Sequence, residues 1–221
     1  MYVYYIPHRL CELNGVNILK EQNLSTLKKM TSILVIDDRD FTYLEPLKQY
    51  EYNISQKNDL NMLTDVEAFD VILCDIRGVG KFLESTFEGA NLIKQLKKKY
   101  PNKTIIAYTA NDYDASFQEY LVYADEIVPK GGYDIEDWDS LLTRILKECA
   151  NPTTQWKKTR KALEEADVQT VDIAKYESDY VKAVKSGKFD SIRKLYCNSD
   201  KKGSQIMIEL LSSIAVKLLT K

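Results

Sequence analysis

The sequence of 221 residues contains a single histidine, His8, and four cysteines with no Cys-x-x-Cys pair. Because His8 is the only candidate, we expect neither Ser-His-Asp catalysis, Cys-His catalysis nor a histidine-based metal site, unless a partner supplies an imidazole. Widely separated cysteines predict neither a disulfide scaffold nor a zinc knuckle, so we expect four lone buried thiols. Any chemistry must come from carboxylates, hydroxyls and lysines.

An excess of one charge and long apolar runs are also lacking. The formal charge is −2, which leaves no bulk charge for coating DNA or an acidic membrane. Eight glycines and five prolines are too few for a collagenous chain, and 44% hydrophobic residues are too many for a disordered one. No stretch reaches about 18 uncharged apolar residues, and the N-terminus lacks a signal-peptide pattern. We therefore expect a globular cytoplasmic protein that does not enter a membrane.

From Ser32 onward, short apolar runs alternate with amphipathic segments. The candidate strands are 33–36, 52–55, 71–74, 104–108 and 126–128. Apolar residues at helical spacing begin, between these runs, near Asp40, Leu60, Gly89, Ala115 and Asp134. This alternation predicts an α/β fold with a doubly wound, five-stranded parallel sheet covered by helices on both faces.

The two ends of the chain differ from this central region. Asn14-Gly15 lies between segments rich in β-branched and aromatic residues, which predicts an N-terminal hairpin followed by a linker over 1–31. Asn151-Pro152 ends the alternating series, because proline disfavours a helical residue before it. The sequence beyond has helical periodicity and carries 14 basic against 9 acidic residues. We therefore predict a sheet domain over 32–150 and a helical region over 151–221.

Five polar or charged side chains stand where the predicted strands end. They are Asp37, Asp38, Asp75, Thr109 and Lys130. Because ligands of an open parallel sheet bind at the carboxyl ends of its strands, we expect these groups to converge on one rim. Neighbouring carboxylates repel one another unless a cation lies between them, and Mg²⁺ prefers oxygen ligands of this kind. With the cation bound, Asp75 is placed to attack a phosphoryl group.

The residues of this rim, in this order, resemble the site of a response-regulator receiver (CheY-like) domain over about 32–149. The matching elements are Asp37-Asp38, Asp75, Thr109-Ala110 and Lys130. The resemblance implies a flavodoxin-like sheet of strand order 2-1-3-4-5. It also implies Mg²⁺ as a cofactor and phosphorylation by a histidine kinase or a phosphotransfer protein.

The resemblance assigns a role to each residue. Asp38 and Asp75 would bind Mg²⁺ directly, Asp37 would do so mainly through water, and the backbone carbonyl of Arg77 would complete the protein ligands. Asp75 would accept the phosphoryl group. The residues that bind the transferred group would be Thr109, Ala110 and Lys130.

Three features depart from the receiver pattern. The segment after Asp75 is longer than usual, so Glu88-Gly89 matches the family's Asp-Gly only after an insertion. Lys130 is followed by Gly131, where proline is usual. Ile127 stands three residues before the lysine, where an aromatic switch residue is common. The phosphoacceptor chemistry therefore matches the family, while the route from phosphate to output looks unusual.

Two other interpretations of the same residues remain. A degenerate receiver would act as a docking module without phosphorylation. Asp38-Arg39-Asp40-Phe41-Thr42 also spells the DxDxT pattern of haloacid-dehalogenase-type phosphatases, in which Asp38 would attack phosphate and Asp40 would act as general acid. That interpretation leaves Asp75 without a role, so we expect a signalling protein rather than an enzyme.

The C-terminal region shows no helix-turn-helix, winged-helix, cyclase or phosphodiesterase pattern. Its last predicted helix, 204–219, is apolar around most of its circumference. We therefore predict a module for homodimerisation or for docking a helical partner protein. DNA binding is a less favoured alternative that the basic charge of the region keeps open.

Overall fold

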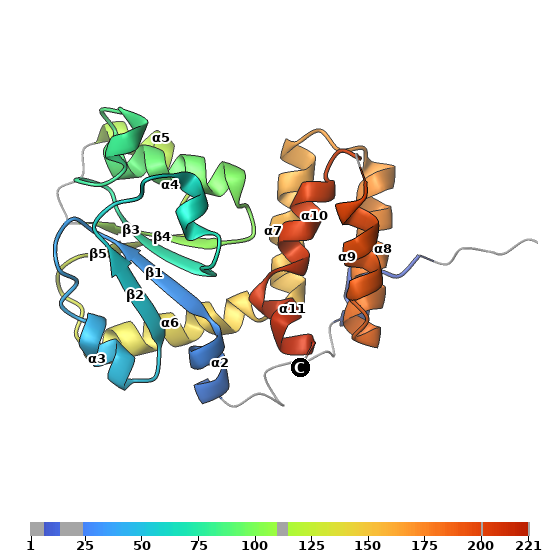
Figure 1. The fold of residues 1–221 in the computed structure, drawn as a ribbon, viewed down its shortest axis with the longest axis horizontal. Coiled ribbons are helices and arrows are strands. Elements are labelled where there is room, and N and C mark those ends of the chain that lie inside the picture. Colours follow the sequence, from blue (N-terminus) through green and yellow to red (C-terminus); the bar gives the residue numbers. More distant parts are fainter. Residues whose placement is uncertain (1–6, 14–23, 110–114, 200, 221) are drawn as a thin grey trace, which may run out of the picture. The chain divides into compact units, whose positions relative to one another are not determined.

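The computed structural model describes residues 7–13, 24–109, 115–199 and 201–220. These residues fall into two compact units (Figure 1). The sheet unit comprises the described residues from Leu24 to Lys147, and the helical unit joins residues 7–13 to those from Glu148 onward. The N-terminal segment therefore groups with the C-terminal helices, whereas the sequence suggested a separate N-terminal region.

The sheet unit contains five parallel strands in the order β2-β1-β3-β4-β5. The strands are β1 (Ser32–Ile36), β2 (Asn53–Lys57), β3 (Val71–Asp75), β4 (Thr104–Thr109) and β5 (Glu126–Pro129). Helices cover both faces of the sheet, so the central strands β3 and β4 are buried along their whole length. The predicted flavodoxin-like fold and its strand order are confirmed.

Five α-helices and three short 3₁₀-helices accompany the sheet. They are α2 (Leu24–Met30), α3 (Leu44–Gln49), η2 (Leu63–Val66), η3 (Lys81–Leu83), α4 (Glu88–Lys99), η4 (Ala115–Phe117), α5 (Gln118–Leu121) and α6 (Ile135–Cys149). Helices α4 and α5 lie on one face of the sheet, and α3 and α6 lie on the other (Figure 1). Leu92 and Leu96 of α4 share a buried core with Ile72 and Cys74 of β3.

The helix predicted near Leu60 is reduced to the four residues of η2. Asp65 Oδ2 accepts hydrogen bonds from the backbone of Asn61 at 2.9 Å and of Met62 at 3.3 Å. The bond from Met62 belongs to a capping box, which fixes where η2 begins. The expectation of a full α-helix between β2 and β3 was wrong.

The helical unit contains five helices of the C-terminal region and one short 3₁₀-helix from the N-terminal segment. They are η1 (Leu10–Leu13), α7 (Pro152–Glu165), α8 (Thr170–Ser186), α9 (Asp190–Cys197), α10 (Ser204–Leu211) and α11 (Ile214–Leu219). The Asn151 side chain caps α7 by accepting from the backbone N–H of Thr153 at 2.9 Å and of Thr154 at 3.2 Å. Among the described residues, no helix has both the length and the apolarity that crossing a membrane requires.

The last predicted helix is two helices, α10 and α11, with Ser212 and Ser213 between them. Most of its apolar residues are buried. Those in the core of the helical unit are Met207, Leu210, Leu211 and Val216. Part of the apolar circumference therefore packs against other helices of the same unit.

The N-terminal segment lies against α8. The backbone N–H of His8 donates to Ser178 Oγ at 3.0 Å, and that of Leu10 donates to Glu177 Oε1 at 3.0 Å. Leu13 is buried in the core of the helical unit. The residues of η1 precede Asn14-Gly15, where the hairpin is predicted, and they form a 3₁₀-helix rather than a strand. The hairpin turn itself lies outside the described residues.

The four cysteines are all free, but their environments differ. Cys74 and Cys149 are buried, as expected, whereas Cys11 and Cys197 are exposed. The expectation of four buried thiols was therefore wrong for two of them. Cys11 is in η1 and Cys197 is at the end of α9, and both short helices turn these residues toward solvent.

Candidate functional site

Three carboxylates meet where β1 and β3 end. Asp37 and Asp38 follow β1, and Asp75 is the last residue of the neighbouring strand β3. One carboxylate oxygen from each residue lies within 4.8 Å of the others. Asp37 is only 3% exposed and Asp75 only 6%, while Asp38 faces solvent. The predicted convergence of the acidic residues on one rim is therefore what the structure shows.

Lys130 closes this cluster from the end of β5. Its Nζ donates to Asp37 Oδ2 at 2.6 Å and to Asp75 Oδ2 at 2.5 Å. Its backbone N–H donates to the carbonyl oxygen of Thr109 at 2.6 Å, which fixes the residue beside the end of β4. The lysine is thus a resident cation between two buried carboxylates, which we call, together with Asp38, the acidic notch.

Burial and charge pairing act against each other in the notch. Burial raises the pKa of the Asp75 carboxyl above its usual range, although the hydrogen bond from Lys130 opposes this shift. Burial also lowers the pKa of the Lys130 ammonium, but its hydrogen bonds to Asp37 and Asp75 outweigh that effect and the net shift is upward. The lysine is therefore charged at neutral pH, and Asp75 is a more basic carboxylate than an exposed aspartate.

The thiol of Cys74, next to the acidic notch, is not a reactive nucleophile. Cys74 is fully buried on the α4 face of β3, and burial raises its pKa well above the usual range. A thiol in such surroundings remains protonated and is inert as a nucleophile. Cys74 therefore does not compete with the Asp75 carboxylate at the end of β3.

The loop after β1 is held in place by Gln56 of β2. Its Oε1 accepts from the backbone N–H of Phe41 at 3.0 Å, and its Nε2 donates to the carbonyl oxygens of Asp37 at 3.2 Å and Arg39 at 2.6 Å. Sequence reasoning missed this residue. It lies one residue beyond the predicted strand 52–55, in the observed strand β2.

The loop between β3 and α4 also has an anchor that sequence reasoning missed. Asp59 accepts from the backbone N–H groups of Gly80 at 2.6 Å and Lys81 at 3.1 Å, which ties this loop to the segment after β2. Glu88 Oε2 accepts from the backbone N–H of Gly78 at 2.7 Å. The apparent insertion of the sequence is therefore an ordered loop with two carboxylate anchors.

Two glycines let this loop and α4 approach the acidic notch. A Cβ atom at Gly78, whose φ is +77°, would lie 2.4 Å from Asp38 Oδ2. A Cβ atom at Gly89 would lie 1.9 Å from the backbone carbonyl oxygen of Asp75. Any side chain at either position would displace a residue of the notch. Gly89 therefore lets α4 begin next to Asp75, and Glu88 binds the backbone of the loop before it.

The remaining predicted residues have different positions. Thr109 ends β4 and is buried, next to Lys130 through the backbone. Arg77 follows Asp75 by two residues, and its backbone N–H donates to Asp75 Oδ1 at 3.3 Å. Ala110 lies outside the described residues. Asp40 is exposed and is not one of the clustered carboxylates in the described part of the chain.

The donor set of the notch fits a hard divalent cation. All the clustered ligand atoms are carboxylate oxygens, and one ammonium leaves two of the three negative charges uncompensated. Mg²⁺ prefers oxygen ligands and keeps several waters, and the exposed Asp38 leaves an open side for them. Asp37, Asp38 and Asp75 are therefore the residues suited to hold such an ion.

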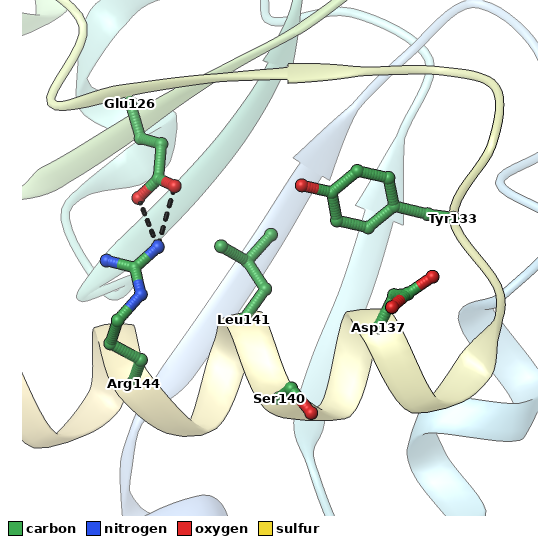
Figure 2. A pocket seen from close by; sticks show the side chains of 6 residues that line it. All are labelled: Glu126, Tyr133, Asp137, Ser140, Leu141 and Arg144. Atoms are coloured by element: carbon green, nitrogen blue, oxygen red, sulfur yellow. Dashed lines mark hydrogen bonds and ion pairs between the residues drawn. The ribbon is translucent and has the colours of Figure 1, made fainter.

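A shallow groove between β5 and α6 lies apart from this chemistry. Figure 2 shows that Glu126, Tyr133, Asp137, Ser140, Leu141 and Arg144 line it. Its volume is about 530 Å³, and the Arg144 side chain donates to both carboxylate oxygens of Glu126, at 2.6 and 2.8 Å. None of the notch residues lines this groove.

Similarity to known proteins is found among solved structures. No family model matches the sequence, and no curated protein matches it. Among solved structures, the chain is similar to the BeF₃-activated DrrB receiver domain, with 22% identity and a TM-score of 0.43 over 53% of this chain and 98% of that one.

Two further structures are similar to about the same extent. One is a CheY-like receiver domain protein from Methanospirillum hungatei, with 21% identity and a TM-score of 0.40 over 53% of this chain and 94% of that one. The other is the response regulator TrrA from Thermotoga maritima in complex with Mg²⁺-BeF, with 18% identity and a TM-score of 0.39 over 52% of this chain and 98% of that one. Over about half of its length, this chain is similar to response-regulator receiver domains.

Proposed function

We propose that this chain is a response regulator that accepts a phosphoryl group on Asp75. The observation that carries the proposal is the acidic notch, in which Asp37, Asp38 and Asp75 lie within 4.8 Å of one another and Lys130 bridges two of them. A buried, basic carboxylate beside a resident ammonium is suited to forming an acyl phosphate. Asp40 lies outside this cluster, so the phosphatase interpretation has no comparable support.

The transfer is a substitution at phosphorus. One carboxylate oxygen of Asp75 attacks the phosphorus of a phosphohistidine, so that a P–O bond forms while the P–N bond breaks. The bonding electron pair leaves with the imidazole nitrogen. Bound by Asp37, Asp38, Asp75 and the backbone carbonyl of Arg77, Mg²⁺ would neutralise charge on the phosphoryl oxygens. The donor is a histidine kinase or a phosphotransfer protein.

Lys130 changes partner during this transfer. Before it, the ammonium is shared by Asp37 and Asp75; after it, a phosphoryl oxygen replaces the carboxylate oxygen of Asp75 as its partner. Thr109 and the backbone at Ala110 bind the remaining oxygens in this proposal. The added charge biases the β3–α4 loop, where Gly78 and Glu88 are hydrogen bonded, and the helical unit passes the change to a partner protein or a second copy.

The experiment is covalent modification by a small phosphodonor. Intact protein is incubated with acetyl phosphate and Mg²⁺ and then analysed by mass spectrometry. We expect one phosphoryl adduct on the wild type and none on Asp75→Asn. The matched control is Asp40→Asn, an exposed aspartate in the same region of the sheet edge, which retains the adduct. Chelation of Mg²⁺ abolishes the modification of the wild type.

Two outcomes would contradict this proposal. If neither acetyl phosphate nor beryllofluoride modifies or binds the wild type in the presence of Mg²⁺, the chain is a docking module with a degenerate notch. If the protein instead hydrolyses a phosphomonoester continuously, and that activity is lost in Asp38→Asn but kept in Asp75→Asn, the phosphatase interpretation replaces it.

A further inference from the structure

An aromatic cluster lies under the acidic notch, on the side of the sheet that α6 covers. Tyr108 of β4 contacts Phe41 and Trp138, with ring centroids 5.5 Å apart in each pair. Phe41 and Trp138 are themselves 5.3 Å apart at 88°. Edge-to-face contacts of this kind fix the orientation of a ring, and all three residues are buried. The Tyr108 ring is therefore a rigid surface.

This rigid ring faces the lysine of the notch. Lys130 Nζ lies 5.0 Å from the centroid of the Tyr108 ring, within the range of a cation–π interaction. The ammonium thus has two carboxylates and one aromatic face as partners. Ile127 occupies the position where receivers commonly carry an aromatic switch residue, and it is 43% exposed. The aromatic contact of the lysine comes from β4 instead.

The lysine side chain has four flexible carbons, so a contact with a rigid ring is needed to hold its ammonium in place once its carboxylate partner changes. The hydrogen bond to Asp75 is given up when that oxygen carries phosphorus, and water then competes for the ammonium. The ring contact does not depend on the phosphorylation state, since Tyr108 is held by Phe41 and Trp138 rather than by the carboxylates.

We propose that Tyr108 is a positioning residue for Lys130, which keeps the ammonium over the notch while its partner changes from the Asp75 carboxylate to the phosphoryl oxygen. This inference rests on the proposed function, because it concerns the same lysine. In this proposal, Tyr108 touches neither the phosphoryl group nor the metal ion. The ring acts through Lys130, so its loss weakens the phosphorylated state more than the binding of Mg²⁺.

Isothermal titration calorimetry measures the affinity for Mg²⁺ and the affinity for beryllofluoride separately. Mg²⁺ is titrated first, and beryllofluoride is then titrated at saturating Mg²⁺, into wild type, Tyr108→Phe and Tyr108→Leu. We expect Tyr108→Leu to raise the Kd for beryllofluoride roughly threefold to tenfold, the range of a partly buried cation–π contact. The Kd for Mg²⁺ should change less than about twofold by the same principle, since the ring supports the lysine and supplies no ligand atom to the ion. Tyr108→Phe keeps the ring and should behave like wild type.

A spectroscopic signature tests the contact itself. Ring current from Tyr108 should shift the Hε protons of Lys130 upfield in NMR spectra of protein labelled at lysine side chains. The shift should persist in Tyr108→Phe, disappear in Tyr108→Leu and be assigned by its absence in Lys130→Met. A Tyr108→Met variant provides a second ring-free side chain if leucine disturbs the packing.

The outcomes distinguish this inference from the proposed function. If wild type binds no beryllofluoride, the proposed function fails and this inference with it. If wild type binds it, the inference alone is overturned by any of three results: Tyr108→Phe is as weak as Tyr108→Leu, the affinities for Mg²⁺ and beryllofluoride fall by the same factor, or the Lys130 signal is unshifted.

Discussion

In the sheet unit, the buried carboxylates gather at one edge, where Asp37 and Asp75 depend on Lys130. In the helical unit, the corresponding carboxylate is Glu177, which accepts from the indole N–H of Trp156 at 2.9 Å and from the backbone of Leu10 at 3.0 Å. Glu177 thereby joins α7, α8 and the N-terminal segment. The first arrangement leaves charge for a ligand, whereas the second uses its charge to hold protein segments together.

The difference has a thermodynamic consequence. Burying carboxylates beside one ammonium costs solvation free energy that the pairing only partly returns, so the acidic notch is a weak source of stability. The N-terminal segment, by contrast, adds apolar burial and hydrogen bonds to the helical unit. Substitutions in the two units should therefore respond differently to pH and to Mg²⁺.

The largest effect should come from Leu13→Ala in the helical unit. Leu13 is 3% exposed in a core that includes residues of α7, α8 and α10. Removing most of a buried leucine side chain costs about 3 kcal/mol of unfolding free energy. Hydrogen exchange followed by mass spectrometry should show faster exchange in α8 and unchanged exchange in β3.

The matched control is Leu195→Ala, because this leucine of α9 is 55% exposed. Its removal should leave the exchange of α8 unchanged. Equal acceleration in both units after Leu13→Ala would contradict the assignment of the N-terminal segment to the helical unit alone.

The sheet unit and its acidic notch could be predicted from the sequence, because they depend on local patterns. Each strand of the sheet was predicted to within about two residues, because a buried parallel strand is a run of apolar residues that local periodicity detects. Asp37, Asp38, Asp75 and Lys130 follow from the strand ends, since parallel strands bring their carboxyl ends to one edge. Local patterns were therefore sufficient for the notch.

Local patterns were not sufficient where a contact joins distant segments. Gln56 and Asp59 hold the loops of the notch through hydrogen bonds from one side chain to backbone groups, which leave no periodic signal. The docking of η1 on α8 joins residues that are about 170 positions apart. For the same reason, the apolar circumference of 204–219 indicated burial against other helices or a second subunit but did not identify α7 and α9 as neighbours.

An intermediate effect should come from Lys130→Met in the sheet unit. The substitution leaves two buried carboxylates without their cation. A fully buried pair would lose about 3–5 kcal/mol, and the lysine side chain is 23% exposed; we therefore expect a loss of about 2 kcal/mol near neutral pH. Mg²⁺ should restore stability, since it supplies the missing positive charge. Urea unfolding with and without Mg²⁺ measures both effects.

The pH dependence of this variant has a defined sign. The pKa of Asp75 is already raised in the folded protein, so folding favours its protonated form, and that contribution is lost as pH rises through the folded-state pKa. Removing the ammonium raises this pKa further. The loss of unfolding free energy in Lys130→Met should therefore be smaller at acidic pH. Lys48→Met, which removes an exposed lysine of α3, should change stability by less than roughly 0.5 kcal/mol at every pH.

The smallest effect should come from Glu12→Gln, at the surface of the helical unit. Hydrogen bonds from Lys185, from His8 and from the backbone of Arg9 lower the pKa of Glu12 from 4.5 to about 2. A lowered pKa stabilises the fold above the unfolded-state value and loses that contribution as pH falls from 4.5 toward 2. The helical unit of the wild type should therefore be more stable than that of Glu12→Gln above pH 4.5, and this difference should disappear as pH falls toward 2. Hydrogen exchange in α8 measures the difference. High salt should reduce the difference, because the carboxylate is partly exposed and its partners are screened. A difference that persists below this window, or that appears in β3, would show that Glu12 acts through packing rather than through its charge.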